Sequence, residues 1–210
     1  MAHLHVLALT LLSFCGAEVL AEYKIIKGVP TFCGSYECPK FQVLKKYDTF
    51  ELRQYDTTQW VTTYLELDGL GLGIMKSFKR LYNYINGDNS EGLSLEMNVP
   101  VRVTVPLHGS TNNATISLFL PRALSTPPKP KNPTLVLESF PPTSFYVRCF
   151  GGYALKSDFE KQSKVLAEAL TSLGLPFEEE YGMAAAYNDP LTFFKRHNEV
   201  WFRSRNQETR

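Results

Sequence analysis

Cysteine is the residue type in this chain with the most distinctive chemistry, because a thiol can form a disulfide, bind a metal or act as a nucleophile. The 210-residue sequence contains four cysteines, of which Cys15 lies in an N-terminal segment that is predicted to be removed. Cys33 and Cys38 enclose only Gly-Ser-Tyr-Glu, a flexible segment that lets the two side chains approach. We therefore predict a local disulfide between Cys33 and Cys38, with Cys149 left as a buried free thiol.

Histidine, the usual general base and a common metal ligand, is scarce. The chain has four histidines, and only His108 and His197 lie beyond residue 21. Neither His-Glu-x-x-His nor Gly-x-Ser-x-Gly occurs, and Gly69, Gly71 and Gly73 lack the last interval of a dinucleotide-binding fingerprint. We therefore predict that the protein is not an enzyme and assign no catalytic residues. A pair of carboxylates is the alternative that the sequence leaves open.

The start of the chain has the pattern of a secretory signal. Residues 4–14 form an uncharged apolar run that is too short to span a bilayer, and small residues follow before the polar Glu22. Cleavage after Ala21 gives a signal peptide of residues 1–21, with cleavage after Ala17 as the alternative. A retained anchor or a buried N-terminal helix is the competing interpretation. We predict a secreted, extracellular protein.

A glycosylation motif and the charge balance bear on the partners. Asn113-Ala114-Thr115 is an N-glycosylation sequon in a polar segment, so we predict a glycan on Asn113. The formal net charge is +1 and no run of five Lys or Arg residues occurs, which argues against nucleic acid as a partner. Beyond residue 21 no apolar stretch has the length of a transmembrane helix, so no membrane span is expected.

The strands that must position these residues are visible in the sequence pattern. Alternating or β-branched runs predict strands at residues 50–55, 60–65, 99–105, 115–120, 182–187 and 199–203. The prolines within and beside 99–105 favour an edge strand or strand ends at these positions. Four prolines in residues 125–133 exclude regular structure there and indicate an extended crossover on the surface.

Two amphipathic helices are predicted from residues at helical spacing. The first is capped by Asp68, stops at Gly87 and has an apolar face of Ile74, Phe78, Leu81, Tyr82 and Ile85. The second opens with a Ser157/Glu160 capping box, stops at Gly174, and has Phe159, Leu166, Leu170 and Leu173 on one side.

The two halves of the chain follow the same order of elements. Residues 145–150 (Phe-Tyr-Val-Arg-Cys-Phe) match residues 50–55 (Phe-Glu-Leu-Arg-Gln-Tyr) at a constant offset of 95, and a helix follows in each half. Coincidence is the alternative explanation of so short a match. Two strand-helix-strand halves, each with a helix face to bury, predict one α+β domain whose sheet curls into an open or closed barrel with the helices outside.

The same segments resemble the SOUL family of haem-binding proteins, whose hallmark motifs occur here in order. They are Tyr-Asp-Thr-Phe-Glu-Leu-Arg-Gln-Tyr at 47–55, Phe-Lys-Arg-Leu-Tyr-Asn-Tyr-Ile-Asn-Gly-Asp-Asn at 78–89, Leu-Glu-Met-Asn-Val-Pro-Val at 95–101, Phe-Tyr-Val-Arg-Cys-Phe-Gly-Gly-Tyr at 145–153, Ala-Tyr-Asn-Asp-Pro at 186–190 and Arg-His-Asn-Glu-Val-Trp at 196–201. The resemblance delimits a SOUL domain at 41–204. An extension at 22–40 with the predicted disulfide precedes it, and a tail at 205–210 follows.

The resemblance implies a distorted antiparallel β-barrel flanked by two helices. It also implies that haem or a related porphyrin binds non-covalently in a mainly apolar groove beside the first helix. Met75, Phe78, Lys79 and Tyr82 would offer this groove, since they combine soft apolar and aromatic surface with a cation for a propionate. His197 completes the proposed cofactor-binding set. An ordinary core face of the helix is the competing interpretation of the same spacing.

The resemblance leaves the metal ligand unknown. Gln54 stands where some family members have histidine, and an amide is a poor iron ligand. Tyrosine is a further candidate, as is the thiolate of Cys38 before Pro39, although the thiolate competes with the disulfide. His108 and His197 each have a structural role as the alternative.

The function predicted from the sequence is that of a secreted haem or porphyrin carrier, scavenger or buffer. The alternative is a secreted interaction protein that has kept the scaffold and lost tight haem binding. The scaffold by itself does not decide between the two, because one fold serves many functions.

Intact mass spectrometry of the secreted protein tests the predicted processing. We expect a chain that begins at Glu22, carries one disulfide, and loses mass when an N-glycosidase removes the glycan on Asn113. Alkylation of the unfolded chain without reduction should label the thiol of Cys149 alone. Labelling of three thiols would exclude the disulfide, and an unchanged mass after the glycosidase would exclude the glycan.

Overall fold

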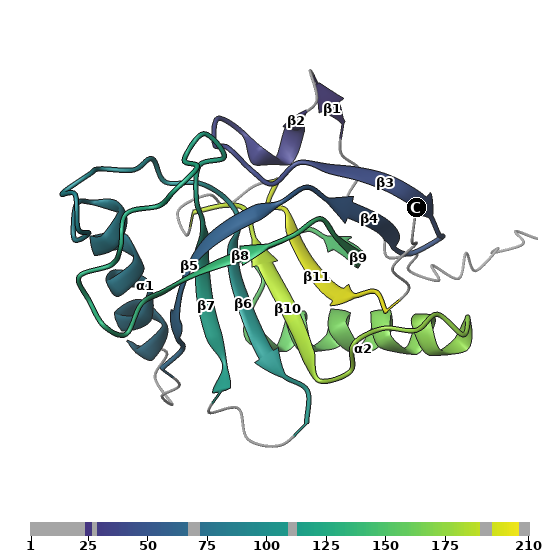
Figure 1. Cartoon of the computed structure of the whole chain (residues 1–210). Helices are drawn as coiled ribbons and strands as arrows, with labels where there is room; N and C mark the ends of the chain where they lie inside the picture. Colours follow the sequence, from purple (N-terminus) through teal and green to yellow (C-terminus); the bar gives the residue numbers. More distant parts are fainter. Residues whose placement is uncertain (1–23, 27–28, 67–71, 109–112, 190–194, 206–210) are drawn as a thin grey trace, which may run out of the picture.

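The computed structural model describes residues 24–26, 29–66, 72–108, 113–189 and 195–205 (Figure 1). Its helices are α1 (Leu72–Ile85), α2 (Lys156–Ser172) and a short 3-10 helix, η1 (Thr31–Cys33). Its strands are β1 (Ile25–Ile26), β2 (Val29–Pro30), β3 (Phe41–Lys46), β4 (Glu51–Tyr55), β5 (Thr58–Tyr64), β6 (Val101–Pro106), β7 (Thr115–Phe119), β8 (Val136–Phe140), β9 (Thr143–Phe150), β10 (Tyr181–Ala186) and β11 (Asn198–Arg203). The predicted signal peptide, the Asp68 cap and residues 206–210 of the tail lie outside the described residues.

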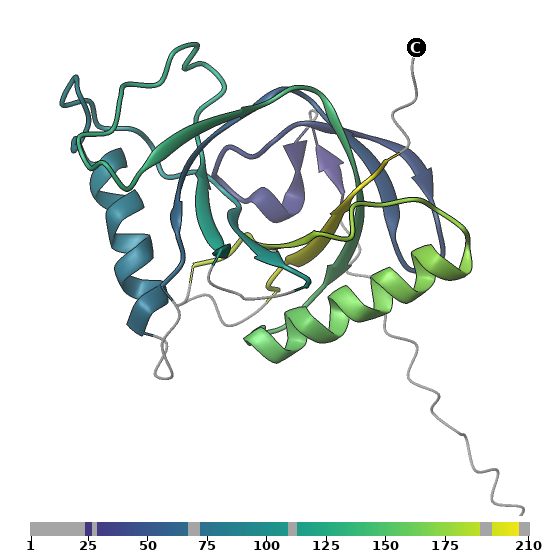
Figure 2. The ribbon, with the colours of Figure 1, turned by 60° about the horizontal axis from the view of Figure 1, so that its bottom comes forward.

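Nine strands form one antiparallel sheet in the order β3-β4-β9-β11-β10-β6-β7-β5-β8, and β1 and β2 form a separate pair. The large sheet curls round, and Figure 2 shows its strands as a ring with both helices on the outside. α1 packs against β5 and β7, and α2 packs against β9 and β11. The predicted α+β fold, a distorted antiparallel barrel with two flanking helices, is confirmed. Within the described residues no helix is long and apolar enough to span a bilayer.

The predicted similarity of the two halves is visible in the strand order. β4, β5, β6 and β7 take the same relative places in the first half as β8, β9, β10 and β11 take in the second. The halves pair at the centre, where β10 lies beside β6, and each contributes one helix to the outer face. They also exchange their first strands, because β4 pairs with β9 of the second half and β8 pairs with β5 of the first.

The match at an offset of 95 residues, however, aligned strands that do not correspond. It compared residues 50–55, mostly β4, with residues 145–150 of β9, whereas β9 corresponds to β5 because each leads into a helix. β4 and β9 are direct neighbours, with Arg53 opposite Phe145. Their arginines lie on opposite faces of the sheet, since Arg53 binds Glu199 inside the barrel and Arg148 donates to Gln162 of α2.

The prolines near β6 mark its ends and not a sheet edge. β6 lies between β10 and β7, so the alternative of an edge strand was wrong. Pro100 precedes the strand and Pro106 is its last residue. The strand between them keeps its backbone donors, which an internal strand needs for pairing on both sides.

Alternation along the strands divides the core into inner and outer clusters. On β9, Val147 and Cys149 belong to an inner cluster with Trp201, whereas Tyr146 packs outward with Leu170 of α2. α1 covers a third cluster over β5 and β7. The inner cluster fills the barrel, and the two outer clusters attach the helices.

The stop of α2 at Gly174 is confirmed, whereas its N-terminal cap and the burial of Leu173 differ from the prediction. The helix begins at Lys156, and the Asp158 carboxylate accepts a 2.8 Å hydrogen bond from the backbone N–H of Leu155, in place of the expected Ser157/Glu160 box. Leu166 and Leu170 are buried as predicted. Leu173 is 55% exposed, because the helix ends at Ser172 and the chain turns away at Gly174, whose φ is +63°.

Leu170 and Leu173 form a matched pair for measuring how firmly α2 is attached. Leu170 is fully buried and Leu173 is exposed. We expect Leu170→Ala to lower the free energy of unfolding by about 2–5 kcal/mol, because it leaves a cavity against the sheet. Leu173→Ala should cost less than about 0.5 kcal/mol. Urea unfolding followed by circular dichroism measures both, and equal losses would contradict the packing of α2 described here.

Candidate functional site

Four side chains of α1 form one strip along the helix surface, which we call the α1 strip: Met75, Phe78, Lys79 and Tyr82. Residues three or four apart lie on the same side of a helix. Met75 is 62% exposed and Tyr82 is 49% exposed, Lys79 is exposed and Phe78 is partly buried. The rings of Phe78 and Tyr82 are stacked, with centroids 6.2 Å apart. The structure thus brings together four of the five predicted cofactor-binding residues.

The α1 strip is exposed because the sheet covers a different side of the helix. The buried face consists of Ser77, Leu81, Tyr84 and Ile85. The prediction that Ile74 and Tyr82 share this face was wrong, since Ile74 is 46% exposed. Apolar residues occupy a wider arc of α1 than the sheet can cover. The part that remains uncovered includes the α1 strip.

Contacts with the end of β5 hold α1 in this orientation. Arg80 forms an ion pair with Glu66 and donates a 2.8 Å hydrogen bond through Nη2 to the carbonyl of Tyr64. Gly73 approaches Glu66 so closely that a Cβ at this position would lie 2.3 Å from the Glu66 carbonyl oxygen. The hydroxyl of Ser77 accepts from the backbone N–H of Glu66 at 2.9 Å. These contacts fix the rotation of the helix and therefore which residues face outward.

Phe78 connects the α1 strip to the outer cluster that α1 covers. Val101, Val103 and Val105 of β6 are partly buried and pack against the same cluster. Two hollows in the described surface, of about 410 and 390 Å³, are lined by residues outside α1. Because Met75 and Tyr82 are exposed, the α1 strip is an apolar surface that suits one face of a flat ligand.

His197, the fifth predicted residue, lies apart from the α1 strip. It directly precedes β11, whereas α1 packs on β5 and β7, and β10 and β6 lie between. The side chain is 4% exposed, and its Nε2 lies 2.7 Å from Oε1 of Glu199. Its ring is stacked on Phe32 with centroids 3.8 Å apart and planes at 2°. The structural alternative for His197 is thus supported by two specific contacts.

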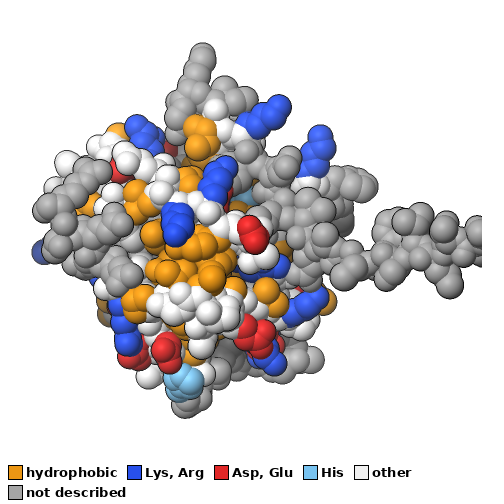
Figure 3. Space-filling view, turned by 90° about the vertical axis from the view of Figure 1, so that its right-hand side faces the viewer, with side chains coloured by type: hydrophobic (Ala, Val, Ile, Leu, Met, Phe, Trp, Pro, Cys, Tyr) orange, Lys and Arg blue, Asp and Glu red, His pale blue; other side chains and the backbone are white. Residues whose placement is uncertain are grey.

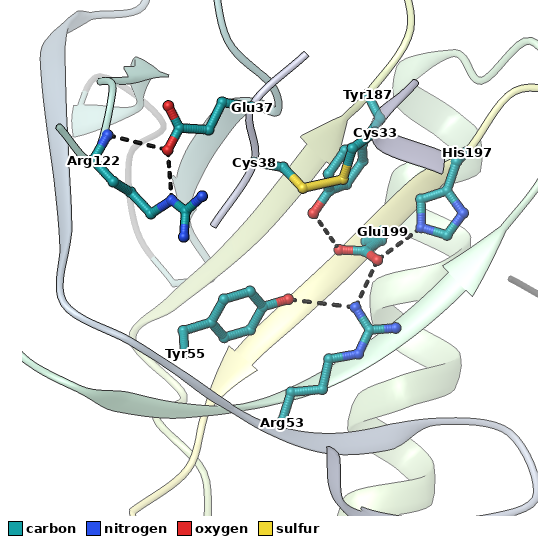
Figure 4. The surroundings of a disulfide bond; sticks show 9 residues. All are labelled: Cys33, Glu37, Cys38, Arg53, Tyr55, Arg122, Tyr187, His197 and Glu199. Atoms are coloured by element: carbon teal, nitrogen blue, oxygen red, sulfur yellow. Dashed lines mark hydrogen bonds and ion pairs between the residues drawn. A yellow bond between two sulfur atoms is a disulfide. The ribbon is translucent and has the colours of Figure 1, made fainter. Parts of the chain in front are cut away.

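Glu199 is the centre of a buried polar network that the sequence patterns did not single out (Figure 4). Its Oε1 accepts from Arg53 Nη1 at 2.8 Å, and its Oε2 accepts from the Tyr187 hydroxyl at 2.9 Å and from Trp201 Nε1 at 2.7 Å. Glu199 and Trp201 are two residues apart on one strand, so they share its inner face. The signal available in the sequence was that Glu199, a charged residue, is two residues from Trp201 and so shares its face of the strand.

Electrostatics explain how this carboxylate remains charged inside the barrel. Burial acts to raise the pKa of Glu199, but the charge of Arg53 and the hydrogen bond and charge of His197 outweigh it and leave the pKa well below its ordinary value. Burial, the charge of Glu199 and other neighbours raise the pKa of the Cys149 thiol. The donor atoms of Cys149, His197 and Glu199 lie within 4.8 Å of one another. In this structure the three side chains belong to an ion-pair and hydrogen-bond network, in which Glu199 pairs with Arg53 and His197.

The extension before β3 closes one end of the barrel with a disulfide. Cys33 and Cys38 are bonded, with Cα atoms 6.1 Å apart, and both are buried in the inner cluster. Figure 4 shows the bond beside Tyr187 and near Glu199. Cys149 is a buried free thiol. Because its sulfur is bonded to Cys33, Cys38 is not available as the thiolate ligand that the sequence left open.

The remaining candidates lie at separate places. Asn113 is exposed and precedes β7, which leaves its side chain accessible to a glycan. His108 is exposed and follows β6. Gln54 lies on β4 opposite Ser144 of β9, whereas α1 packs on β5 and β7. Gln54 is therefore not on a strand that α1 covers. The structure places no histidine of the described residues on α1.

Comparison with known proteins identifies relatives over most of the chain. Residues 36–203 match the family described as "SOUL heme-binding protein". Heme-binding protein 2 of Homo sapiens is 31% identical over 166 residues, which cover 77% of this chain and 81% of that protein. Heme-binding protein 1 of Xenopus tropicalis is 28% identical over 157 residues, which cover 73% and 82% of the two chains.

A similar fold occurs in a solved structure of distant sequence. The crystal structure of a hydrolase from Listeria innocua superposes with a TM-score of 0.50 at 12% identity, over 76% of this chain and 93% of that one. An identity this low indicates the fold alone. The activity named for that protein carries no information about this one.

The acid stability of the protein tests the Glu199 network. Because the folded state lowers the pKa of Glu199, the carboxylate stabilises the fold fully above the pKa of an unfolded glutamate, about 4.3, and this contribution is lost as the pH falls further. Glu199→Gln should lower the free energy of unfolding by about 3–5 kcal/mol at pH 7, because Arg53 loses its buried partner.

Urea unfolding at pH 7, 5 and 3 separates the Glu199 contribution from that of other carboxylates. The difference between wild type and Glu199→Gln should be constant from pH 7 to 5 and shrink toward pH 3. Glu180→Gln is the control, since Glu180 is exposed at the surface. A difference that grows on acidification would contradict the assigned direction of the pKa shift.

Proposed function

The chain belongs to the SOUL haem-binding protein family, and on this basis we propose that it binds haem or a related porphyrin reversibly at the α1 strip. The observation that carries the proposal is the exposure of Met75 and Tyr82 on the same side of α1 as the partly buried Phe78. Soluble proteins seldom leave such adjoining apolar side chains uncovered without a binding role. The relatives that share the domain are named as haem-binding proteins.

The chemistry of the α1 strip matches a porphyrin in three respects. The rings of Phe78 and Tyr82 offer aromatic surface to a flat conjugated ligand. Met75 is flexible and polarisable, so it adapts to the ligand edge. Lys79 lies between them in sequence and provides an exposed cation for a propionate.

Apolar contact, and not iron coordination, is proposed as the main source of affinity. Burial stabilises a complex by about 25 cal/mol per Å² of apolar surface, and both partners contribute surface here. His197 is buried and bound to Glu199, so ligation by His197 would break the network. We therefore do not assign His197 as a ligand of the haem iron.

A secreted role as carrier, scavenger or buffer is the biological form of this proposal. It is supported by the apolar N-terminal run, by a disulfide that is typical of oxidising compartments, and by the exposure of Asn113 in its sequon. Reversible surface binding suits transport or buffering, because the ligand remains accessible for transfer. No reaction of the bound ligand is proposed.

An interaction protein without tight haem binding is the second candidate. Figure 3 shows hydrophobic side chains gathered near the centre of the face that lies on the right-hand side of Figure 1, with charged side chains around them. Leu44 on β3 and Leu173 after α2 are among the exposed apolar residues of the chain. A surface of this kind suits a protein partner. The haem titration distinguishes the two candidates.

Titration of the mature protein with haemin, followed at the Soret band, tests the proposal. We expect saturation near one equivalent for wild type. Phe78→Ala and Tyr82→Ala should each weaken binding by about tenfold, which is about 1.4 kcal/mol, whereas His197→Ala should weaken it less. Metal-free protoporphyrin should bind within about tenfold of haemin, because packing dominates.

Leu173→Ala is the matched control, since it removes an exposed leucine far from α1 in the sequence. Circular dichroism checks that each variant is folded. Non-saturating association of wild type would support the interaction protein instead. Loss of the Soret shift in His197→Ala, together with failure of protoporphyrin to bind, would overturn the site and make coordination the main contribution.

A further inference from the structure

The disulfide segment forms a cap on the barrel, which we define as residues 29–38. Cys33 is 1% exposed and Cys38 is 5% exposed, and both pack with Tyr55, Tyr187 and Trp201 in the inner cluster. In Figure 2 the segment that contains η1 is seen within the ring of strands. The cap therefore occupies the end of the barrel that would otherwise open toward the Glu199 network.

Phe32 sits in an aromatic site at this end. Its ring lies flat on His197, with centroids 3.8 Å apart and planes at 2°, and meets Tyr187 edge-on at 4.7 Å and 72°. The edge-on contact with Tyr187 is an arrangement that aromatic pairs prefer, and the parallel contact lays the Phe32 ring against one face of the imidazole. His197 is held in place by Glu199, so this wall of the site is rigid. Phe32 thus fills a preformed place for one aromatic ring.

The ring and its site come from different parts of the chain. The family match covers residues 36–203, which include Tyr187 and His197. Phe32 and Cys33 lie before the matched segment. The walls therefore lie within the matched segment, and the ring that fills them comes from the residues before it.

The disulfide connects a self-contained part of the extension to an anchored part. The backbone N–H of Thr31 donates to the carbonyl of Lys24, and the backbone N–H of Gly34 donates to the carbonyl of Thr31. Both hydrogen bonds stay within the extension. Glu37, by contrast, accepts from Val99 N–H through its carbonyl and pairs with Arg122 through its carboxylate, as Figure 4 shows for the second contact. The Cys33–Cys38 bond ties the first group to the second.

We propose that this end of the barrel is a ligand site for a small molecule with one flat aromatic ring, occupied by Phe32 while the disulfide is closed. A dithiol reductant opens it: two electrons and two protons convert the S–S bond to two thiols, and the reductant becomes a disulfide. Phe32 then leaves its place and the ligand ring stacks on His197. This goes beyond porphyrin binding, since the α1 strip lies on the outer face of the barrel.

Binding of 4-fluorophenol, followed by the width of its fluorine NMR line, tests the proposal. The full-length mature chain is compared in three forms: oxidised wild type, wild type with dithiothreitol, and Cys33→Ser/Cys38→Ser. We expect the last two forms to broaden the fluorine line of 4-fluorophenol until it saturates. Their Kd for 4-fluorophenol should be at least tenfold lower than that of the oxidised protein. Competition by unlabelled phenol should restore the narrow line.

Phe32→Ala with the disulfide intact keeps the test valid if the serine variant fails to fold. It should bind 4-fluorophenol in the place that the ring vacates. Glu180→Gln is the control and should bind 4-fluorophenol as wild type does, because Glu180 is exposed at the surface and lies in neither proposed site. Absence of binding to folded Phe32→Ala would overturn the aromatic site, and equal binding by oxidised and reduced wild type would overturn its control by the disulfide.

Discussion

A carboxylate enclosed in a β-barrel must be neutralised and fully hydrogen-bonded, and Glu199 imposes this requirement on the structure around it. Its charge partner Arg53 comes from β4, its second Oε1 partner His197 precedes β11, and Tyr187 follows β10. These residues meet only when β4, β9, β11 and β10 are paired in their observed register. The network thus selects one alignment of the sheet, and it presents the flat face of His197 to Phe32.

The pairing of two similar halves explains where binding surfaces are available. The sheet order places β10 beside β6 at the centre and one helix on the outer face of each half. The interior is filled by the inner cluster, which includes Trp201 and the Cys33–Cys38 bond. A large flat ligand therefore has to bind outside, where α1 has more apolar surface than the sheet can cover. A single ring can be accommodated at the end of the barrel, where Phe32 already lies.

The proposed porphyrin surface and the proposed ring site differ in chemistry as well as in place. The α1 strip consists of three exposed residues and one partly buried residue on one helix, so its proposed affinity depends on apolar area and one cation, Lys79. The barrel end is built from buried side chains of several segments, so its geometry is rigid and its occupant is selected by shape. Fold resemblance alone would not separate these roles, since a hydrolase shares the architecture.

The sequence by itself determined the family, both helices and the strands of the large sheet except β3 and β8, because these depend on local periodicity and on motifs in a fixed order. It predicted both helices, the internal similarity of the halves, and the nearness of Cys33 to Cys38, whose separation in the chain is only five residues. It also placed the α1 strip correctly as a unit, since spacing along one helix is enough to put residues on one side.

Only the tertiary structure decided which side of each element is covered. Ile74 and Leu173 fit an apolar pattern but are exposed, because the sheet meets α1 on another face and α2 ends before Leu173. The sequence analysis grouped His197 with the helix residues as a ligand contact, but its Nε2 is hydrogen-bonded to Glu199. Contacts such as that between Arg53 and Glu199, 146 residues apart, arise from strand pairing across the whole chain, and no local pattern encodes them.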